Sequence, residues 1–367
     1  MDHLATLLKI IEGGISSNST RVLSYSKLLM GRLSDEGDNA AAEKIRRVIE
    51  DSPSATLYPT GGLGLPVDKD SRHSLADETN PSINESFIAL DPMVQDAVGE
   101  FLSFVENASV LYDAGVGISP FMLIYGPPGC GKTQLANHVA SRLKLPLLTA
   151  RCDALVSSLL GSTSKNIRNL FEHASNRACV LFLDEFDALA KARDDQHEVG
   201  ELKRVVVSLL QNIDQLPKDT VLIAATNHES LLDNAVWRRF DYRVQIKLPT
   251  ASIREQLIEY FFRDYECKSI KNIVAITDGF SGAIIRQVCE AAIRTAVLSK
   301  VNVIDEKKLL IKIAQVKYQN IIYADMSAEE KIVALNEQNS KLFTTRLLNE
   351  LFGVSTGKIS KLINATP

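Results

Sequence analysis

Residues 126–133 form a glycine-rich run that ends in a lysine and a threonine. The run follows the apolar segment 121–125 and precedes a helical segment from Gln134, and it reads Gly126, Pro127, Pro128, Gly129, Cys130, Gly131, Lys132, Thr133. Glycines let backbone N–H groups crowd around an anion, and a helix beginning there directs its positive end at the same point. The spacing predicts a binding site for nucleotide phosphates, formed by residues 126–134.

Each polar member of this run has its own expected task. Lys132 supplies a point charge to the β- and γ-phosphates of ATP, and the Thr133 hydroxyl binds Mg²⁺. Cys130 contributes only its backbone, so we assign it no redox role.

A pair of adjacent acids, Asp184 and Glu185, follows the apolar run 180–183. Alone, two acids after a strand could equally well be a solvated loop. Beside a phosphate site they predict chemistry: Asp184 holds Mg²⁺ through water, and Glu185 is the general base that polarises the attacking water. The two motifs together predict ATP hydrolysis.

These motifs lie in a region where apolar runs and helical stretches alternate. Strands are expected at 121–125, 145–150, 179–183, 221–225 and 243–248, with helices that include 167–174 and 201–213. Nearly continuous apolar strands separated by helices indicate an α/β fold whose parallel sheet is covered on both faces. After Pro249 the pattern is helical throughout, over 251–323.

The first fifty residues predict two or three short helices. Leu4, Leu7, Leu8 and Ile11 form one apolar stripe, which we expect these helices to bury against one another. Gly13-Gly14 is expected to end the first helix, and Ser34-Asp35 to cap a later one. Residues 51–84 are rich in Pro, Gly, Ser and charge, which is typical of a linker.

Bulk properties indicate a soluble chain of more than one domain. It has 367 residues, 45% hydrophobic residues and a net charge of −4, so no basic field covers the whole molecule. Five scattered cysteines without CxxC spacing argue against disulfides or zinc. No signal peptide and no membrane-spanning segment are visible, so we expect a cytoplasmic protein without membrane contact.

Three further motifs carry a family resemblance. Residues 221–227 (VLIAATN) and 231–241 (LLDNAVWRRFD) follow the acidic pair in order, and residues 279–283 (GFSGA) lie in the helical region. With the two earlier motifs they resemble the AAA+ ATPase superfamily over about residues 85–300. Within it the chain is similar to the branch that holds katanin, spastin and the ATPase modules of membrane-associated proteases, and to bacterial stand-alone AAA proteins.

The resemblance implies further site residues. Asn227 orients the attacking water, Arg238 and Arg239 are arginine fingers, and Gly282 and Ala283 pack on the base and ribose. The family usually has Asp where this chain has Ile284. In the family the fingers act on the neighbouring subunit's nucleotide, so the resemblance implies a homo-oligomeric ring, usually of six subunits.

The resemblance also bears on what such a ring would act on. Residues 155–162 align with the pore loop that grips a threaded polypeptide in relatives. Leu159 stands where relatives carry an aromatic residue, and Leu160 follows it. The alternative interpretation of residues 155–162 is the buried end of a helix. A protein substrate or partner protein, gripped by Leu159 and Leu160, is the expectation.

The last forty residues form a separate helical unit. Residues 344–365 predict a helix, a turn at Gly353 and a second helix, which resembles a DNA-binding helix-turn-helix. Asn349 stands where a small residue normally permits close helix crossing, and the basic residues are few. A helical hairpin that packs on the preceding helices or on a neighbouring subunit is the alternative.

We therefore expect an N-terminal helical domain (1–50), a linker (51–84), a large α/β ATPase domain (85–250), a helical lid (251–323) and a C-terminal helix-turn-helix-like unit (324–367). The leading functional hypothesis is a protein-remodelling or protein-unfolding motor, alone or with a partner protease. The alternatives are a nucleic-acid-associated ATPase recruited through residues 344–365 and a nucleotide-gated scaffold that controls a partner enzyme.

Overall fold

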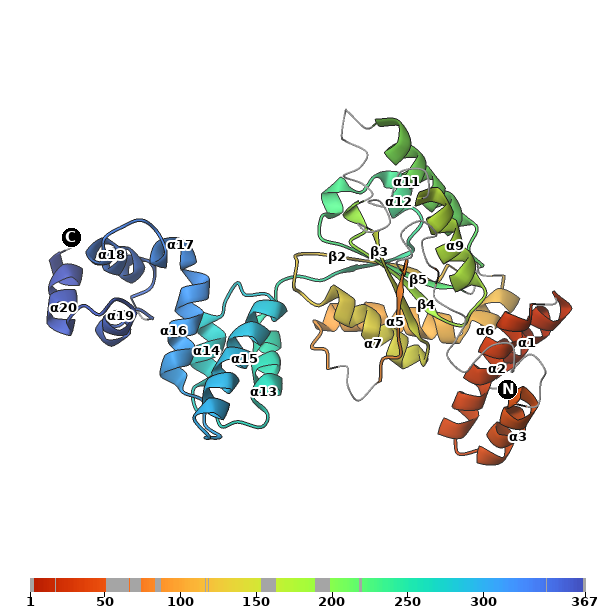
Figure 1. Ribbon diagram of the computed structural model, residues 1–367, viewed down its shortest axis with the longest axis horizontal. Coiled ribbons are helices and arrows are strands. Elements are labelled where there is room, and N and C mark those ends of the chain that lie inside the picture. The colour runs from red at the N-terminus through yellow and green to blue at the C-terminus, as the bar shows by residue number, and fades with distance from the viewer. Residues whose placement is uncertain are drawn as a thin grey trace. The chain divides into compact units, whose positions relative to one another are not determined.

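The computed structural model describes residues 3–16, 18–50, 66, 74–82, 87–115, 117, 119–152, 163–188, 199–217, 220–340 and 342–365. These fall into two compact units, residues 1–247 and 248–367. Figure 1 shows a first unit built around a sheet and a second unit made of helices.

The first unit contains a six-stranded sheet with the order β1-β3-β4-β5-β2-β6. The strands are β1 (Asp77–Thr79), β2 (Phe121–Tyr125), β3 (Leu147–Arg151), β4 (Val180–Asp184), β5 (Val221–Thr226) and β6 (Tyr242–Gln245). All pairings are parallel except that of β1 with β3. All five predicted strands are present, with ends that differ by a few residues. The parallel α/β prediction is therefore confirmed.

Helices cover both faces of this sheet. The covering helices are α5 (Pro92–Glu106), α7 (Lys132–Leu143), α9 (Thr163–Ser175), α11 (Val199–Asp214) and α12 (Asn234–Trp237). The short elements α6 (Ala108–Asp113) and η1 (Glu229–Leu231) complete this part of the unit. Side chains of α9 and α11 share one apolar cluster with Leu123 and Leu222, whereas α5 and α7 share another with Met122 and Ile223. Successive strand residues thus enter opposite cores, which is why β2 and β5 are apolar without interruption.

The edge strand β1 lies inside residues 51–84, where the sequence predicted only a linker. Glu78 in β1 forms an ion pair with Arg177 at 2.7 Å, and the second pair of their atoms lies 3.0 Å apart. A three-residue polar strand shows no alternation of apolar residues, so composition alone could not reveal it.

Three helices precede this sheet along the chain: α1 (Leu4–Ile15), α2 (Ser19–Asp35) and α3 (Asn39–Glu50). The predicted burial of the α1 stripe is wrong: Leu4 is 42% exposed, Leu8 44% and Ile11 55%. The face of α1 that is buried carries Thr6 and Gly13 instead. The helix therefore packs through its small residues and leaves its large apolar residues outside.

The helix ends predicted at Gly13-Gly14 and Ser34-Asp35 are also wrong. Gly13 lies inside α1, and a Cβ built on it would come within 2.9 Å of the Val22 side chain. Gly13 therefore permits α1 and α2 to approach rather than ending the helix. Helix α2 ends at Asp35, so Ser34 and Asp35 belong to its last turn, and it is Asp38 whose carboxylate caps α3 by accepting the Ala41 N–H at 3.0 Å.

The second unit consists of helices, as predicted for the chain after Pro249. They are α13 (Ala251–Phe262), α14 (Ile270–Ile276), α15 (Gly282–Leu298), α16 (Glu306–Lys317), α17 (Gln319–Ile322), α18 (Ala328–Gln338), α19 (Thr345–Phe352) and α20 (Thr356–Ala365). Helix α16 joins two cores: Leu309 and Ile313 pack with α13–α15, and Ala314 packs with α18–α20. Among the described helices of both units, none is long and apolar enough to cross a membrane.

Candidate active site

The glycine-rich run forms a loop between the carboxyl end of β2 and the start of α7. Gly126, Gly129 and Gly131 all have positive φ angles, of 141°, 72° and 99°. L-residues other than glycine rarely adopt such angles, so these positions explain the glycines of the motif. Helix α7 then begins at Lys132, so its free N–H groups are presented at the loop.

Gly126 also lies against the segment that follows β6. A Cβ built on it would be 1.9 Å from the carbonyl oxygen of Ile246. Because that neighbour is backbone, it has no rotamer that could relieve the clash. The close approach holds the start of the phosphate loop against the chain that leaves the sheet.

Lys132 is buried, and its ammonium group is held by the loop itself. Its Nζ donates to the carbonyl oxygens of Gly126 at 2.7 Å and Pro127 at 2.9 Å. Burial lowers the pKa of Lys132, while Asp184 and Asp187 act in the opposite direction. The positive charge is thus fixed at the centre of the phosphate loop. The neighbouring Cys130 thiol is half-buried and its pKa is raised by desolvation, in keeping with a backbone role.

The structure brings together the two residues expected to bind a cation. The hydroxyl of Thr133 donates to Oδ2 of Asp184 at 3.2 Å, across the gap between α7 and β4. A hydroxyl and a carboxylate are hard oxygen ligands of the kind that Mg²⁺ prefers, and Mg²⁺ commonly takes its remaining ligands from water and phosphate. The residues present therefore fit this ion.

Glu185 has a backbone conformation that is rare for its residue type. Its φ is 54°, in the left-handed region, and its N–H donates to Oδ1 of Asp184 at 2.9 Å. Such strain persists only where the surroundings enforce it, and it is concentrated at functional sites. The left-handed residue therefore lies directly after the carboxyl end of β4, next to Asp184.

Asp187 connects this turn to β5, and none of the predicted motifs included it. Its carboxylate is buried and accepts the Thr226 hydroxyl at 3.1 Å and the Asn227 N–H at 3.3 Å. The N–H of Phe186 also donates to the Ala225 carbonyl at 2.8 Å. Asp187 therefore fixes the backbone of Asn227 relative to Glu185. The sequence did offer one signal for it, because Asp187 is a third acid only two residues after Glu185.

The two adjacent arginines differ in their surroundings. Arg239 forms two hydrogen bonds of 2.7 Å with the carboxylate of Asp214, and its third nitrogen donates to the Ala235 carbonyl. The hydrogen bond with Asp214 raises the pKa of Arg239. Arg238 is exposed and forms no ion pair with the described residues. One guanidinium is therefore anchored within its own chain, and the other extends into solvent.

The lid segment, residues 279–283, lies in the second unit. Ser281 caps α15 by accepting the N–H of Ile284 at 3.4 Å, and Gly282 and Ala283 form the first turn. Ile284, which replaces the family's usual Asp, packs against the core of the lid. The substitution therefore has a structural use in this chain. The predicted pore-loop residues Leu159 and Leu160 lie outside the described residues.

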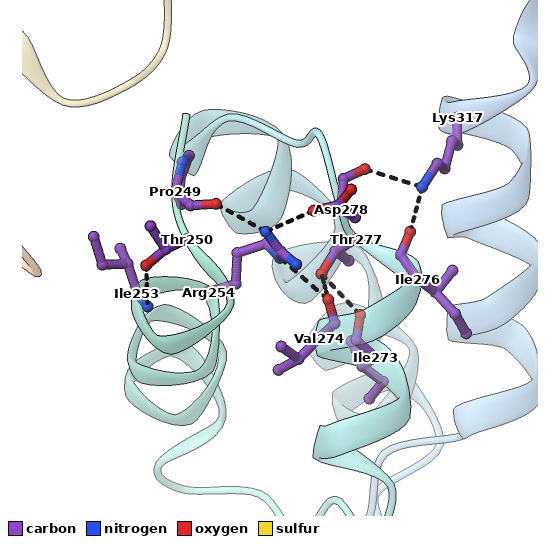
Figure 2. A network of polar contacts seen from close by, with 10 residues as sticks. All are labelled: Pro249, Thr250, Ile253, Arg254, Ile273, Val274, Ile276, Thr277, Asp278 and Lys317. Carbon is purple, nitrogen blue, oxygen red and sulfur yellow. Dashed lines mark hydrogen bonds and ion pairs between the residues drawn. The ribbon is translucent and has the colours of Figure 1, made fainter. Parts of the chain in front are cut away.

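A buried arginine connects the start of the lid with the turn before this segment (Figure 2). Arg254 donates to the carbonyl oxygens of Pro249 at 2.8 Å and Val274 at 3.1 Å, and it lies 3.0 Å from the Asp278 carboxylate. Lys317 of α16 donates to the carbonyls of Ile276 and Asp278 on the other side of the same turn. The network ties the entry of α13 to the turn that leads into α15.

We expect Arg254→Met to loosen this turn. The Arg254 side chain is only 7% exposed, so its loss leaves two carbonyls without their donor, whereas Asp278 is 74% exposed and can be solvated by water. The local stability should fall by about 2–4 kcal/mol. Hydrogen exchange of residues 270–298 measures this loss. Arg263→Met is the control, because Arg263 lies at the end of the same helix with a side chain that is 62% exposed. Equal exchange in both variants would contradict the role of Arg254.

The fold and this site define a nucleotide-binding enzyme of the P-loop class: a strand, a glycine-rich loop and a helix, with two acids at the end of a neighbouring strand. A family profile described as "ATPase family associated with various cellular activities (AAA)" matches residues 122–248. A relative from Sinorhizobium fredii, named "Uncharacterized AAA family ATPase y4kL", is 34% identical over 276 residues, covering 74% of this chain and 83% of that protein. The chain belongs to the AAA ATPase family, and it binds and hydrolyses ATP.

Other relatives share the ATPase region within longer proteins. The ATP-dependent zinc metalloprotease FtsH of Clostridium perfringens is 30% identical over 74% of this chain and 40% of its own length. The nuclear valosin-containing protein-like protein of Mus musculus is 33% identical over 54% of this chain and 25% of its own length. The chain thus spans less than half of both of these proteins.

Proposed function

We propose that this ATPase is a Mg²⁺-dependent motor that works as a homo-oligomeric ring and remodels protein substrates. The single observation that supports a ring is the exposure of Arg238. Its guanidinium extends into solvent beside Arg239, which is already anchored by Asp214. Charge that develops on a transferred phosphoryl group needs such a cation, and in related ATPases it comes from a second subunit. A six-membered ring is the arrangement that we propose.

The chain's own residues suggest how hydrolysis proceeds within one subunit. Residues 126–134 hold the phosphates, and Lys132 neutralises part of their charge. Thr133 and Asp184 would hold Mg²⁺, which supplies additional charge neutralisation when bound. Glu185 takes a proton from the attacking water, and Asn227 orients that water from the backbone position fixed by Asp187. Gly282 and Ala283 would contact the base and ribose.

The substrate is proposed from relatives and from the predicted pore loop. The relatives include ATP-dependent zinc metalloproteases, which join an ATPase of this family to proteolysis. These names favour a polypeptide substrate for the present chain, with or without a partner protease. A cytoplasmic location is proposed from the five scattered cysteines, which lack CxxC spacing. Leu159 and Leu160 are proposed to grip the polypeptide through apolar contacts.

Stimulation of ATP hydrolysis tests this substrate class. We expect an unfolded polypeptide to raise the turnover rate severalfold, and Leu159→Ala to abolish that increase. Leu298→Ala is the matched control, because Leu298 is 79% exposed on α15, and it should leave the increase unchanged. Stimulation by DNA alone, lost on deletion of residues 327–367, would instead support a DNA-associated ATPase. Turnover that responds to neither polymer would support a nucleotide-gated scaffold.

A further inference from the structure

The C-terminal residues form the helix, turn and second helix that the sequence predicted. Helix α19 ends at Gly353, whose φ of 68° is left-handed and whose N–H bonds to the Asn349 carbonyl at 2.7 Å. Val354 and Ser355 form the turn, and α20 begins at Thr356. Figure 1 shows α18, α19 and α20 grouped near the C-terminus. A glycine in this conformation is a common helix stop that lets the chain turn at once into a second helix.

Asn349 departs from the small residue usual at its position, and the structure supplies the reason. Its side-chain amide donates to the Val354 carbonyl at 2.8 Å. The amide thus satisfies a carbonyl of the turn that neither helix uses. The turn between α19 and α20 is therefore fixed by a side-chain contact as well as by its glycine.

The two helices have different surroundings. Helix α19 packs against α16. Leu348 of α19 is fully buried in the core that it shares with Ala314 of α16, and Glu350 forms an ion pair with Lys307. Helix α20 turns Ile359 inward, with Leu362 and Ile363 partly buried beside it. Packing on the lid helix α16 therefore accounts for the buried face of α19. It does not account for the outward face of α20.

The outward face of α20 consists of residues that are not apolar, and each is either uncharged or positively charged. Its exposed residues are Thr356, Gly357, Lys358, Ser360, Lys361 and Asn364. Helix α20 contains no acidic residue, and two acids of the neighbouring helices are paired with lysines: Glu350 with Lys307 and Glu329 with Lys358. On α18, Glu330 is bonded to Ser327 and Glu337 is exposed. Neither Lys361 nor the exposed Arg346 forms an ion pair with the described residues. The unpaired charge on these two helices is thus positive.

We propose that α20 is the recognition helix of a double-stranded DNA-binding site, and that it enters the major groove with this face. Hydroxyl and amide side chains hydrogen-bond to base edges, and ammonium and guanidinium groups contact phosphates. A Cβ built on Gly357 meets no atom within 4 Å, so the backbone at the start of α20 is open to close approach. A protein-docking helix would instead present apolar residues outward. The site does not depend on the proposed protein-remodelling activity.

Binding to DNA with a randomised central segment tests this inference. Rounds of selection on the full chain at low salt should enrich one sequence motif, which binds at least about tenfold more tightly than unselected duplex. Replacing both Ser360 and Asn364 with Ala should remove most of this preference and leave weak non-specific binding. Lys361→Ala should weaken binding to all sequences and reduce the slope of log affinity against log salt by about one.

Lys271→Ala is the matched control for Lys361→Ala, since Lys271 is also an exposed helical lysine of the second unit. It should bind DNA like the original chain. Wild-type rates of ATP hydrolysis in the α20 variants would show that the first unit is intact, and unchanged circular dichroism that the helices are. No enriched motif, or equal affinity of all variants for DNA, would overturn the inference. Polypeptide binding that alone responds to the α20 substitutions would also overturn it.

Discussion

Glu185→Gln is expected to stop ATP turnover while ATP binding persists. The amide is nearly isosteric with the carboxylate, so the strained turn at φ 54° and the hydrogen bond to Asp184 can remain. It cannot accept a proton from water, and loss of a general base typically lowers kcat by about 10²–10⁴-fold. Rates of phosphate release and the affinity for a fluorescent ATP analogue measure the two effects separately.

Glu172→Gln provides the comparison, because Glu172 is an exposed acid on α9 that loses the same charge. Its kcat should match that of the original chain. A Glu185→Gln protein that hydrolyses ATP at the original rate would exclude Glu185 as the base. Lost affinity for the analogue would instead assign the residue to binding.

The parts of the fold that were predicted correctly are those encoded locally. The phosphate loop is one such part, because three left-handed glycines and the first turn of α7 are determined by a few consecutive residues. The strands β2 and β5 are buried on both sides and so read as continuous apolar runs. Local conformation and two-sided burial both leave a pattern in the sequence.

The wrong or missing predictions depend on contacts between distant segments. Which face of α1 is buried depends on how closely Gly13 approaches Val22, and this closeness leaves Leu4 and Ile11 outside. Strand β1 exists because β3 offers it an edge. An apolar stripe shows that a helix is amphipathic, but it does not show which surface covers the stripe.

The same limit applies to the site. Lys132, Thr133, Asp184 and Glu185 follow from two motifs, and the structure places Thr133 and Asp184 in contact. Asp187 is visible as a third acid, but its partners could not be predicted, because they lie at the end of another strand. The adjacent arginines could not be told apart either, since only the position of Asp214 on α11 distinguishes them.

Arg238→Ala is expected to reduce kcat by about 10³-fold. Arg239→Ala should reduce kcat by less. Arg238 is free to extend toward a phosphate, whereas Arg239 is held by both carboxylate oxygens of Asp214 and by the Ala235 carbonyl. If the phosphate belongs to a neighbouring subunit, mixing Arg238→Ala with Lys132→Ala should restore activity. Random mixing in equal amounts forms a complete site at roughly a quarter of the interfaces.

A second mixture shows whether recovery comes from complementary halves of the site. Lys132→Ala and Glu185→Gln both damage the half that holds the nucleotide, so their mixture cannot form a complete site and should stay inactive. Recovery in the first mixture alone therefore requires a guanidinium from one subunit to act on a nucleotide bound by another. Mixed rings of Arg238→Ala and Lys132→Ala that assemble but remain inactive would contradict this arrangement. Full activity of Arg238→Ala with loss in Arg239→Ala would transfer the role to the anchored arginine, with Asp214 as the residue that positions it.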